Sequence, residues 1–159
     1  MEAAADGPQE SVDPDLDEVG GGPMHLRASS IALVWLGGTL GTGSRYLLSD
    51  VTPRPFQLPL AIFMINIVGA FLLGALIERL AIGGPDRGAR RRIRLLAGTG
   101  FLGGFTTYST LAMDSVGLLH ANRPTAFLAY ALGTLILGAV ATCLGMAAGR
   151  LGRRHPVPR

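Results

Sequence analysis

The sequence predicts an all-α membrane protein with four transmembrane helices, the third of which is broken near the middle of the membrane. The chain of 159 residues is 48 % apolar, and its charges are few and bunched. A bilayer core of roughly 30 Å needs about 20 helical residues. Four apolar runs, the first interrupted only by Arg45, approach or exceed that length. The third run also contains glycines and hydroxyl side chains that a regular membrane helix disfavours.

We expect three regions along the chain. They are an acidic N-terminal tail (residues 1–27), a four-helix transmembrane channel domain (28–149, with spans of about 28–49, 58–80, 93–117 and 124–149) and a basic C-terminal tail (150–159). The first 23 residues carry seven acids and no base, and they lack the apolar stretch of a secretory signal. This tail is expected to be disordered because it has too little apolar surface to bury. Met24, close to the first span, leaves a second start site open.

The composition argues against several function classes. Every basic residue is an arginine and most flank a predicted span, so the net charge of +3 indicates membrane topology and headgroup contacts, and no nucleic acid is expected. The single cysteine, Cys143, lies inside the fourth span and offers no disulfide framework. All three histidines lie outside the spans and no metal-ligating cluster is visible, so an enzyme is not expected.

Small residues predict that the spans pack closely. Gly37 and Gly41 lie one turn apart in the first span, a spacing that lets another helix approach. The fourth span begins at Pro124, in a first turn that tolerates proline. Its small residues recur at intervals of three or four and form one stripe: Thr134, Gly138, Ala141, Gly145 and Gly149. These helices therefore pack tightly on one another or on a second subunit.

The third span contains the segment GGFTTYST, residues 103–110. Two glycines followed by two threonines make a poor helix, because each glycine costs about 1 kcal/mol relative to alanine. Irregular backbone at membrane depth persists only when it is buried in protein or lines a wet cavity. A broken helix there can hold a cation with its freed carbonyls or an anion with its amides. The segment therefore predicts an ion site.

The polar side chains inside the spans are mostly neutral. The ionisable residues lie at or near the span ends: Arg45, Glu78, Asp114 and Arg123. The interior offers the amide of Asn66, the hydroxyls of residues 106–110, and those of Tyr130 and Thr134. Tyr130 and Thr134 share a helix face, as do Tyr108 and Leu111. Such residues either join helices by hydrogen bonds or line an ion path.

Three segments, in order, resemble the Fluc/CrcB family of fluoride ion channels. The first span contains GGTLGTGSRY, similar to that family's paired glycines followed by Arg and an aromatic. The second contains LPLAIFMINIVGAFLLG, similar to its pattern of Asn ahead of Gly-x-Phe. The third contains GFLGGFTTYSTLAMD, similar to its GxxGGxTTFSTFSxE. The resemblance covers residues 30–150, which is nearly the whole chain after the tail.

The resemblance implies a passive fluoride channel in the plasma membrane, built as an antiparallel dimer with two narrow pores and one central sodium ion. It places the sodium on the backbone carbonyls of Gly103 and Thr106. It places the anion pathway on eight residues: Asn66, Tyr108, Leu111, Ser109, Thr110, Tyr130, Thr134 and Arg45. Fluoride is small and tightly hydrated, so amide, hydroxyl and aromatic-edge donors suit it. Arg45 would concentrate anions at the vestibule, or else snorkel at a helix end.

One departure from the family pattern leaves the activity open. The family has two phenylalanines three residues apart, where this chain has Tyr108 and Leu111. Tyrosine keeps the ring edge and adds a donor, whereas leucine has no ring quadrupole. A non-conducting partner subunit of a heterodimeric fluoride channel is therefore an alternative. A small multidrug-type proton-coupled exporter is another, although it needs a mid-membrane carboxylate that the predicted spans lack.

The arginines also predict the orientation. Four spans put both termini and the link between the second and third spans on one side. Eleven arginines lie there: Arg27, Arg79, Arg87, Arg90, Arg91, Arg92, Arg94, Arg150, Arg153, Arg154 and Arg159. The other side has Arg54 and Arg123, with Arg45 just inside the first span. Both termini should therefore be cytoplasmic, and the imbalance favours an inverted homologous partner over a homodimer, which stays possible.

Overall fold

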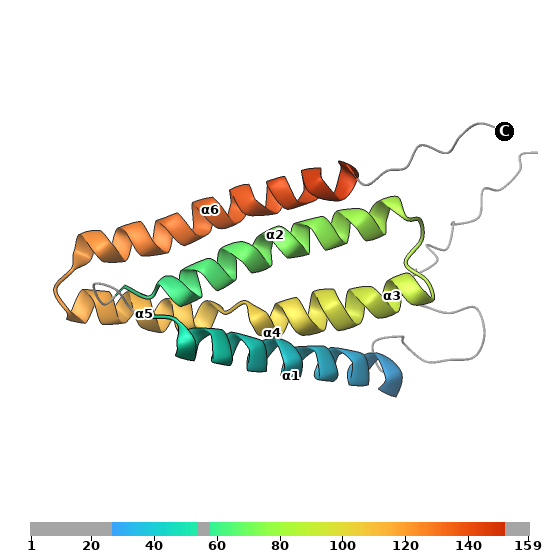
Figure 1. Ribbon diagram of the computed structural model, residues 1–159, viewed down its shortest axis with the longest axis horizontal. Coiled ribbons are helices and arrows are strands. Elements are labelled where there is room, and N and C mark those ends of the chain that lie inside the picture. Colours follow the sequence, from blue (N-terminus) through green and yellow to red (C-terminus); the bar gives the residue numbers. More distant parts are fainter. Residues whose placement is uncertain (1–26, 54–57, 152–159) are drawn as a thin grey trace, which may run out of the picture.

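The computed structural model describes residues 27–53 and 58–151, and all secondary structure in these ranges is helical (Figure 1). Three long helices are continuous: α1 (Ala28–Val51), α2 (Leu60–Ile82) and α6 (Pro124–Leu151). The third position of the bundle is a series of shorter segments: α3 (Ala89–Ile93), the π-helical η3 (Arg94–Leu102), α4 (Gly103–Phe105) and α5 (Tyr108–His120). Figure 1 shows four elongated elements lying side by side, with α2 next to α6 and α1 next to the segmented helix.

The four predicted helices are confirmed, and the break in the third is confirmed as well. The bounds of the first, second and fourth helices differ from the predicted ones by two residues or fewer. The third starts earlier and ends later than predicted, and its chain leaves the helical conformation at Thr106 and Thr107. The predicted tails at residues 1–26 and 152–159 lie outside the described residues.

Among the described residues, two helices are long and apolar enough to cross a membrane by length and composition. These are α2, with a mean hydropathy of 2.6, and α6, with 2.0. The first helix falls short because Gly, Ser, Thr and Arg45 dilute its apolar residues. The third falls short because its break leaves helical stretches of at most 17 residues, 89–105 and 108–120. For these two helices, membrane crossing stays a prediction.

Large apolar side chains are exposed along the outside of the bundle. Trp35 is 70 % exposed, Leu135 is 62 % exposed and Ile136 is 61 % exposed. A soluble monomer rarely exposes contiguous apolar patches of this kind, which mark protein or membrane contacts. Together with the hydropathy of α2 and α6, this surface is that of an integral membrane protein.

Close packing at glycines holds α1 against the segmented helix. Gly37 and Gly41 are buried in α1. A Cβ atom added to Gly37 would overlap the backbone carbonyl of Leu96, and one added to Gly41 would overlap that of Phe101. The prediction that these two glycines admit a neighbouring helix is therefore confirmed.

The stripe of small residues on α6 packs against α2. Thr134, Ala141, Gly145 and Gly149 are buried, while Gly138 is partly buried. A Cβ at Gly145 would meet the carbonyl of Phe71 on α2. The stripe is therefore an intrachain contact in this structure.

Replacing Gly41 with alanine should destabilise the fold by about 1–3 kcal/mol, because overpacking against backbone cannot be relieved by rotating a side chain. The single tryptophan, Trp35, lies in the same helix and reports its unfolding by fluorescence. Gly43→Ala is the matched control, since a Cβ at Gly43 meets nothing within 4 Å. The packing argument is wrong if both variants unfold at the same temperature in detergent.

Candidate functional site

The break in the third helix is clamped by one side chain of α2. Thr106 (φ −78°, ψ 156°) and Thr107 (φ −150°, ψ 125°) are both extended. The backbone N–H of Thr107 donates to Oδ1 of Asn66 over 2.9 Å, and Nδ2 of Asn66 donates to the carbonyl of Thr107 over 3.0 Å. The amide thus satisfies the backbone N–H and the carbonyl of Thr107, which the break removes from the helix. The structure therefore places Asn66 at the break in the third helix, where the sequence predicts an ion site.

Thr107 also starts the helix that follows the break. Its Oγ1 accepts from the backbone N–H of Thr110 over 3.2 Å, which is an N-cap hydrogen bond. The same hydroxyl donates to Oγ1 of Thr110 over 3.1 Å and lies 3.2 Å from Oγ of Ser109. Two of the predicted pathway residues, Ser109 and Thr110, therefore belong to one hydroxyl network centred on Thr107.

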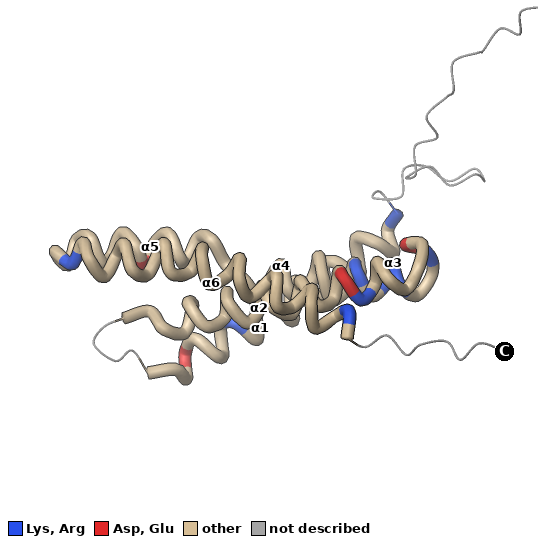
Figure 2. Tube along the Cα trace, turned by 90° about the horizontal axis from the view of Figure 1, so that it is seen from above, with Lys and Arg blue, Asp and Glu red and all other residues tan. Residues whose placement is uncertain are grey.

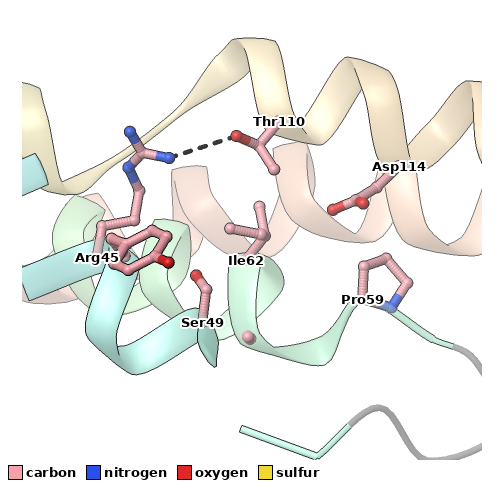
Figure 3. Close-up of a pocket in the computed structure, with 8 residues that line it drawn as sticks. Arg45, Ser49, Pro59, Ile62, Thr110 and Asp114 are labelled. Carbon is pink, nitrogen blue, oxygen red and sulfur yellow. Dashed lines mark hydrogen bonds between the residues drawn. The ribbon is translucent and has the colours of Figure 1, made fainter. Parts of the chain in front are cut away.

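Arg45 reaches the break from α1. Its Nε donates to the carbonyl of Gly104 over 3.3 Å, and its Nη1 donates to Oγ1 of Thr110 over 3.4 Å (Figure 3). Thr42, one turn earlier on α1, donates to the same Gly104 carbonyl over 3.3 Å. In an unbroken helix this carbonyl would pair with the N–H of residue 108. A partly buried positive charge therefore replaces a lost helical hydrogen bond.

A cavity of about 110 Å³ adjoins this arginine (Figure 3). Its lining includes Arg45, Ser49, Thr110 and Asp114, from α1 and α5, together with Ile62 from α2. Among the described residues, the buried Oγ of Ser49 has no hydrogen-bond partner. The cavity therefore presents one charge of each sign and the hydroxyl groups of three residues, Tyr46, Ser49 and Thr110, among otherwise apolar walls beside the break.

Tyr130 and Thr134 lie on the buried face of α6, as predicted for a shared face. Both are buried, and Oγ1 of Thr134 donates to the carbonyl of Tyr130 over 2.7 Å. The hydroxyl of Tyr130 donates to Oδ2 of Asp114 over 3.4 Å. Asp114 lies midway along α5 and not at its end. This carboxylate therefore links the cavity to α6.

Tyr108 and Leu111 have very different surroundings. Tyr108 is 80 % exposed, whereas Leu111 is 8 % exposed and packs in a core cluster with Leu118 and Tyr130. The two residues are three positions apart on α5, so they lie on adjacent parts of its surface. Only Leu111 is covered by this chain, and the ring of Tyr108 is available to lipid or to another subunit.

Gly103 and Thr106 fit a cation held by backbone oxygens. The carbonyl of Gly103 has lost its helical donor, since the N–H of Thr107 is bonded to Asn66. The space beside Gly103 is open, because a Cβ there would meet nothing within 4 Å. Thr106 is extended, so its own carbonyl lies outside the helical pattern. Carbonyls freed at a helix break are suitable ligands for a sodium ion.

Two residues of this site, Thr42 and Thr107, are absent from the predicted pathway and sodium residues, although Thr107 is one of the interior hydroxyls that the sequence offers. Thr107 has a sequence signal, because threonine is a typical N-cap residue directly before a helix. Thr42 has only a weak one, its position three residues before Arg45 on the same helix face. Neither signal predicts that Thr107 bonds Asn66 or that Thr42 bonds the carbonyl of Gly104.

Comparisons with known proteins agree on one family. Residues 32–146 match the family described as "CrcB-like protein, Camphor Resistance (CrcB)". The chain is 49 % identical over 127 residues (80 % of this chain and 88 % of the relative) to the "Fluoride-specific ion channel FluC 2" of Leifsonia xyli subsp. xyli. It is 40 % identical over 136 residues (84 % and 95 %) to the "Fluoride-specific ion channel FluC 1" of Cutibacterium acnes.

The similarity extends to an archaeal protein. The "Fluoride-specific ion channel FluC" of Methanopyrus kandleri is 37 % identical over 131 residues, which cover 80 % of this chain and 95 % of the relative. The family match over residues 32–146 contains most of α1 and α6, all of α2 and the third helix, and the break with Asn66 bound to it. The chain therefore belongs to the CrcB-like protein family.

Proposed function

We propose that this chain is a subunit of a fluoride-selective ion channel that lowers cytoplasmic fluoride by passive export across the plasma membrane. The observation that carries the proposal is the helix break at Thr106 and Thr107, held open by Asn66 with the charge of Arg45 beside it. Relatives covering most of the chain are named fluoride-specific ion channels. An ion channel is not an enzyme, and the described site supports binding and passage of an ion.

The chemistry of the site suits a small, strongly hydrated anion. Several hydrogen-bond donors must surround fluoride to replace its water. Small donor groups are needed, because bulky ones could not approach the same small ion together. Asn66 has a second N–H on Nδ2 besides the one that it gives to Thr107. The proposed pathway comprises Asn66, Tyr108, Ser109, Thr110, Leu111, Tyr130 and Thr134, with Arg45 raising the local anion concentration.

A second candidate function is that of a non-conducting partner in a heterodimeric fluoride channel. Leu111 favours it, because this side chain is apolar and packed in the core cluster with Tyr130. A leucine offers no positive ring edge to an anion. In that case the subunit would orient and complete an active partner.

Fluoride efflux from liposomes distinguishes the two functions. Purified protein is reconstituted alone in liposomes. Efflux is followed with a fluoride electrode after a potassium ionophore is added, so that potassium leaves with fluoride and compensates its charge. A conducting subunit gives efflux far above that of empty liposomes, with little response to chloride. If the chain alone gives none, while co-reconstitution with a homologous subunit does, the partner function is supported. Absence of efflux in both cases contradicts the fluoride proposal.

We further propose a structural sodium ion at the carbonyls of Gly103 and Thr106. Two observations support this proposal. The N–H of Thr107 bonds Asn66 and so leaves the carbonyl of Gly103, and the space beside Gly103 is open. Replacing sodium with a large organic cation should lower the unfolding temperature of the purified protein and its proportion of assembled species. Choline chloride at equal ionic strength is the test, and lithium provides a small-cation control. Identical unfolding in all three salts would argue against a cation here.

The subunit arrangement is proposed from the charges. An antiparallel dimer with a separate inverted homologue would accommodate a chain that inserts with both termini cytoplasmic. We expect C-terminal fusions to a cytoplasm-active fluorescent protein to be bright and fusions to a periplasm-active phosphatase to be inactive. Comparable activity of both reporters would instead indicate dual insertion and a homodimer.

A further inference from the structure

The charges of the described residues gather at one end of the bundle (Figure 2). Eight described arginines belong to the start of α1, the end of α2, the loop after it, α3, the start of η3 and the end of α6, and the acids Glu78 and Asp86 accompany them. The other described charges are two arginines and two acids in the second half of α1, in α5 and in the loop before α6: Arg45, Asp50, Asp114 and Arg123. The α3 end is therefore strongly positive, and the opposite end is close to neutral.

Both acids at the α3 end already have arginine partners. Oε1 of Glu78 accepts from Nε of Arg150 over 2.7 Å, which ties α2 to α6. Oδ2 of Asp86 accepts from Nε of Arg94 over 2.8 Å, which ties the loop to η3. In the described part of the chain, no ion pair engages five further arginines, which we call the arginine cluster: Arg79, Arg87, Arg90, Arg91 and Arg92.

A folded loop holds the arginine cluster together. Gly84 (φ 108°) and Gly88 (φ 58°) adopt left-handed conformations that favour glycine, and they turn the chain from α2 into α3. The guanidinium of Arg90 lies close to Gly83 at the end of α2, since a Cβ there would come within 2.7 Å of its Nε. The side chain of Arg90 is thereby brought to the end of α2, whose last turn contains Arg79.

We propose that the arginine cluster binds the phosphate groups of anionic lipids and so fixes this end of the bundle to one membrane surface. The cluster lies where the apolar α2 ends, which is headgroup depth for a helix that crosses the bilayer. Guanidinium groups bind phosphate through paired, charge-assisted hydrogen bonds. Four of the five are exposed and Arg91 is partly exposed, so the surface is open to lipid.

A different occupant is available within the same chain. Residues 2–18 contain seven acids, and α1 begins at the α3 end of the bundle (Figure 1). Lipid is favoured because the cluster lies beside the exposed apolar surface that lipid covers. Binding of the acidic segment to the cluster would be revealed by the experiment below.

The test is a lipid titration of the full-length protein in neutral detergent. Fluorescent phosphatidylglycerol is compared with fluorescent phosphatidylcholine, at low and at high ionic strength. The variants are Arg90→Gln/Arg91→Gln/Arg92→Gln and the charge-preserving control Arg90→Lys/Arg91→Lys/Arg92→Lys. A third variant lacks residues 2–23. Thermal unfolding shows whether each variant is folded, and the salt dependence of the unaltered protein tests the proposal without any variant.

The expected result is a preference for phosphatidylglycerol that high salt weakens. The glutamine variant should lose about 100-fold in affinity, since each basic residue near an anionic surface strengthens binding about fivefold. The lysine control should keep most of the preference. Three outcomes would each overturn the proposal: an affinity insensitive to salt, a glutamine variant that binds phosphatidylglycerol as the unaltered protein does, or a deletion of residues 2–23 that raises the affinity about 100-fold, which would make the acidic segment the natural occupant.

Discussion

Fluoride flux should fall by about 100-fold when Asn66 is replaced with leucine, which has a similar volume and no polar atoms. The substitution removes both hydrogen bonds to Thr107 and the remaining N–H of the amide. A hydrogen bond to a charged group is worth about 1.5–3 kcal/mol, and about 1.4 kcal/mol corresponds to tenfold in a rate, so losing the N–H that would bind the anion accounts for a drop of this size. The measurement is fluoride efflux from liposomes, normalised to the amount of assembled protein.

Two further variants separate the clamp from the pathway. Asn66→Asp keeps an acceptor for the N–H of Thr107 but has no donor for its carbonyl or for an anion, so it should fold better than Asn66→Leu and conduct as poorly. Thr142→Val is the control, since that hydroxyl bonds only its own helix at Gly138, over 2.9 Å. Full flux through a correctly assembled Asn66→Leu protein would remove Asn66 from the anion path.

The helices and the break were predictable from the sequence for physical reasons. Uncharged runs long enough to cross a bilayer set the predicted helix bounds, so the errors lie mainly at the helix ends. There a charged residue ends the uncharged run but does not end the helix. The break was predictable because Gly103 and Gly104 precede two threonines, and threonine competes for backbone hydrogen bonds. That Gly37 and Gly41 admit a neighbouring helix followed from their spacing alone, whereas the identity of that helix did not.

Other features depend on contacts that spacing does not encode. The π-helical winding of η3 arises where Gly37 and Gly100 let two backbones approach closely, and no periodicity in the sequence indicates it. Arg45 was predicted near a span end, yet its long side chain reaches a carbonyl 59 residues away. Leu111 was placed in the pathway by resemblance, and its burial against Tyr130 became visible only when α5 packed on α6.

Replacing Arg45 with glutamine should reduce fluoride flux by at least about tenfold, through the loss of a charge held in a partly apolar environment. At an effective dielectric constant of about 20, two charges 4 Å apart interact by about 4 kcal/mol, so even partial screening leaves more than the 1.4 kcal/mol needed for a tenfold change. Glutamine retains an N–H donor for the carbonyl of Gly104, so the break keeps one of its contacts while the charge is removed.

Arg45→Lys separates charge from geometry at the same position. Lysine keeps the charge but cannot bond both Gly104 and Thr110 through a rigid fork as Nε and Nη1 of arginine do. If charge governs anion entry, the lysine variant conducts well above the glutamine variant, and high salt narrows the gap between them because ions screen the field. If both are equally impaired at every salt concentration, Arg45 acts by holding the break and not by attracting the anion. Because Thr42 shares the carbonyl of Gly104, Thr42→Val should then reproduce part of the defect, whereas a purely electrostatic role for Arg45 leaves Thr42→Val near full flux.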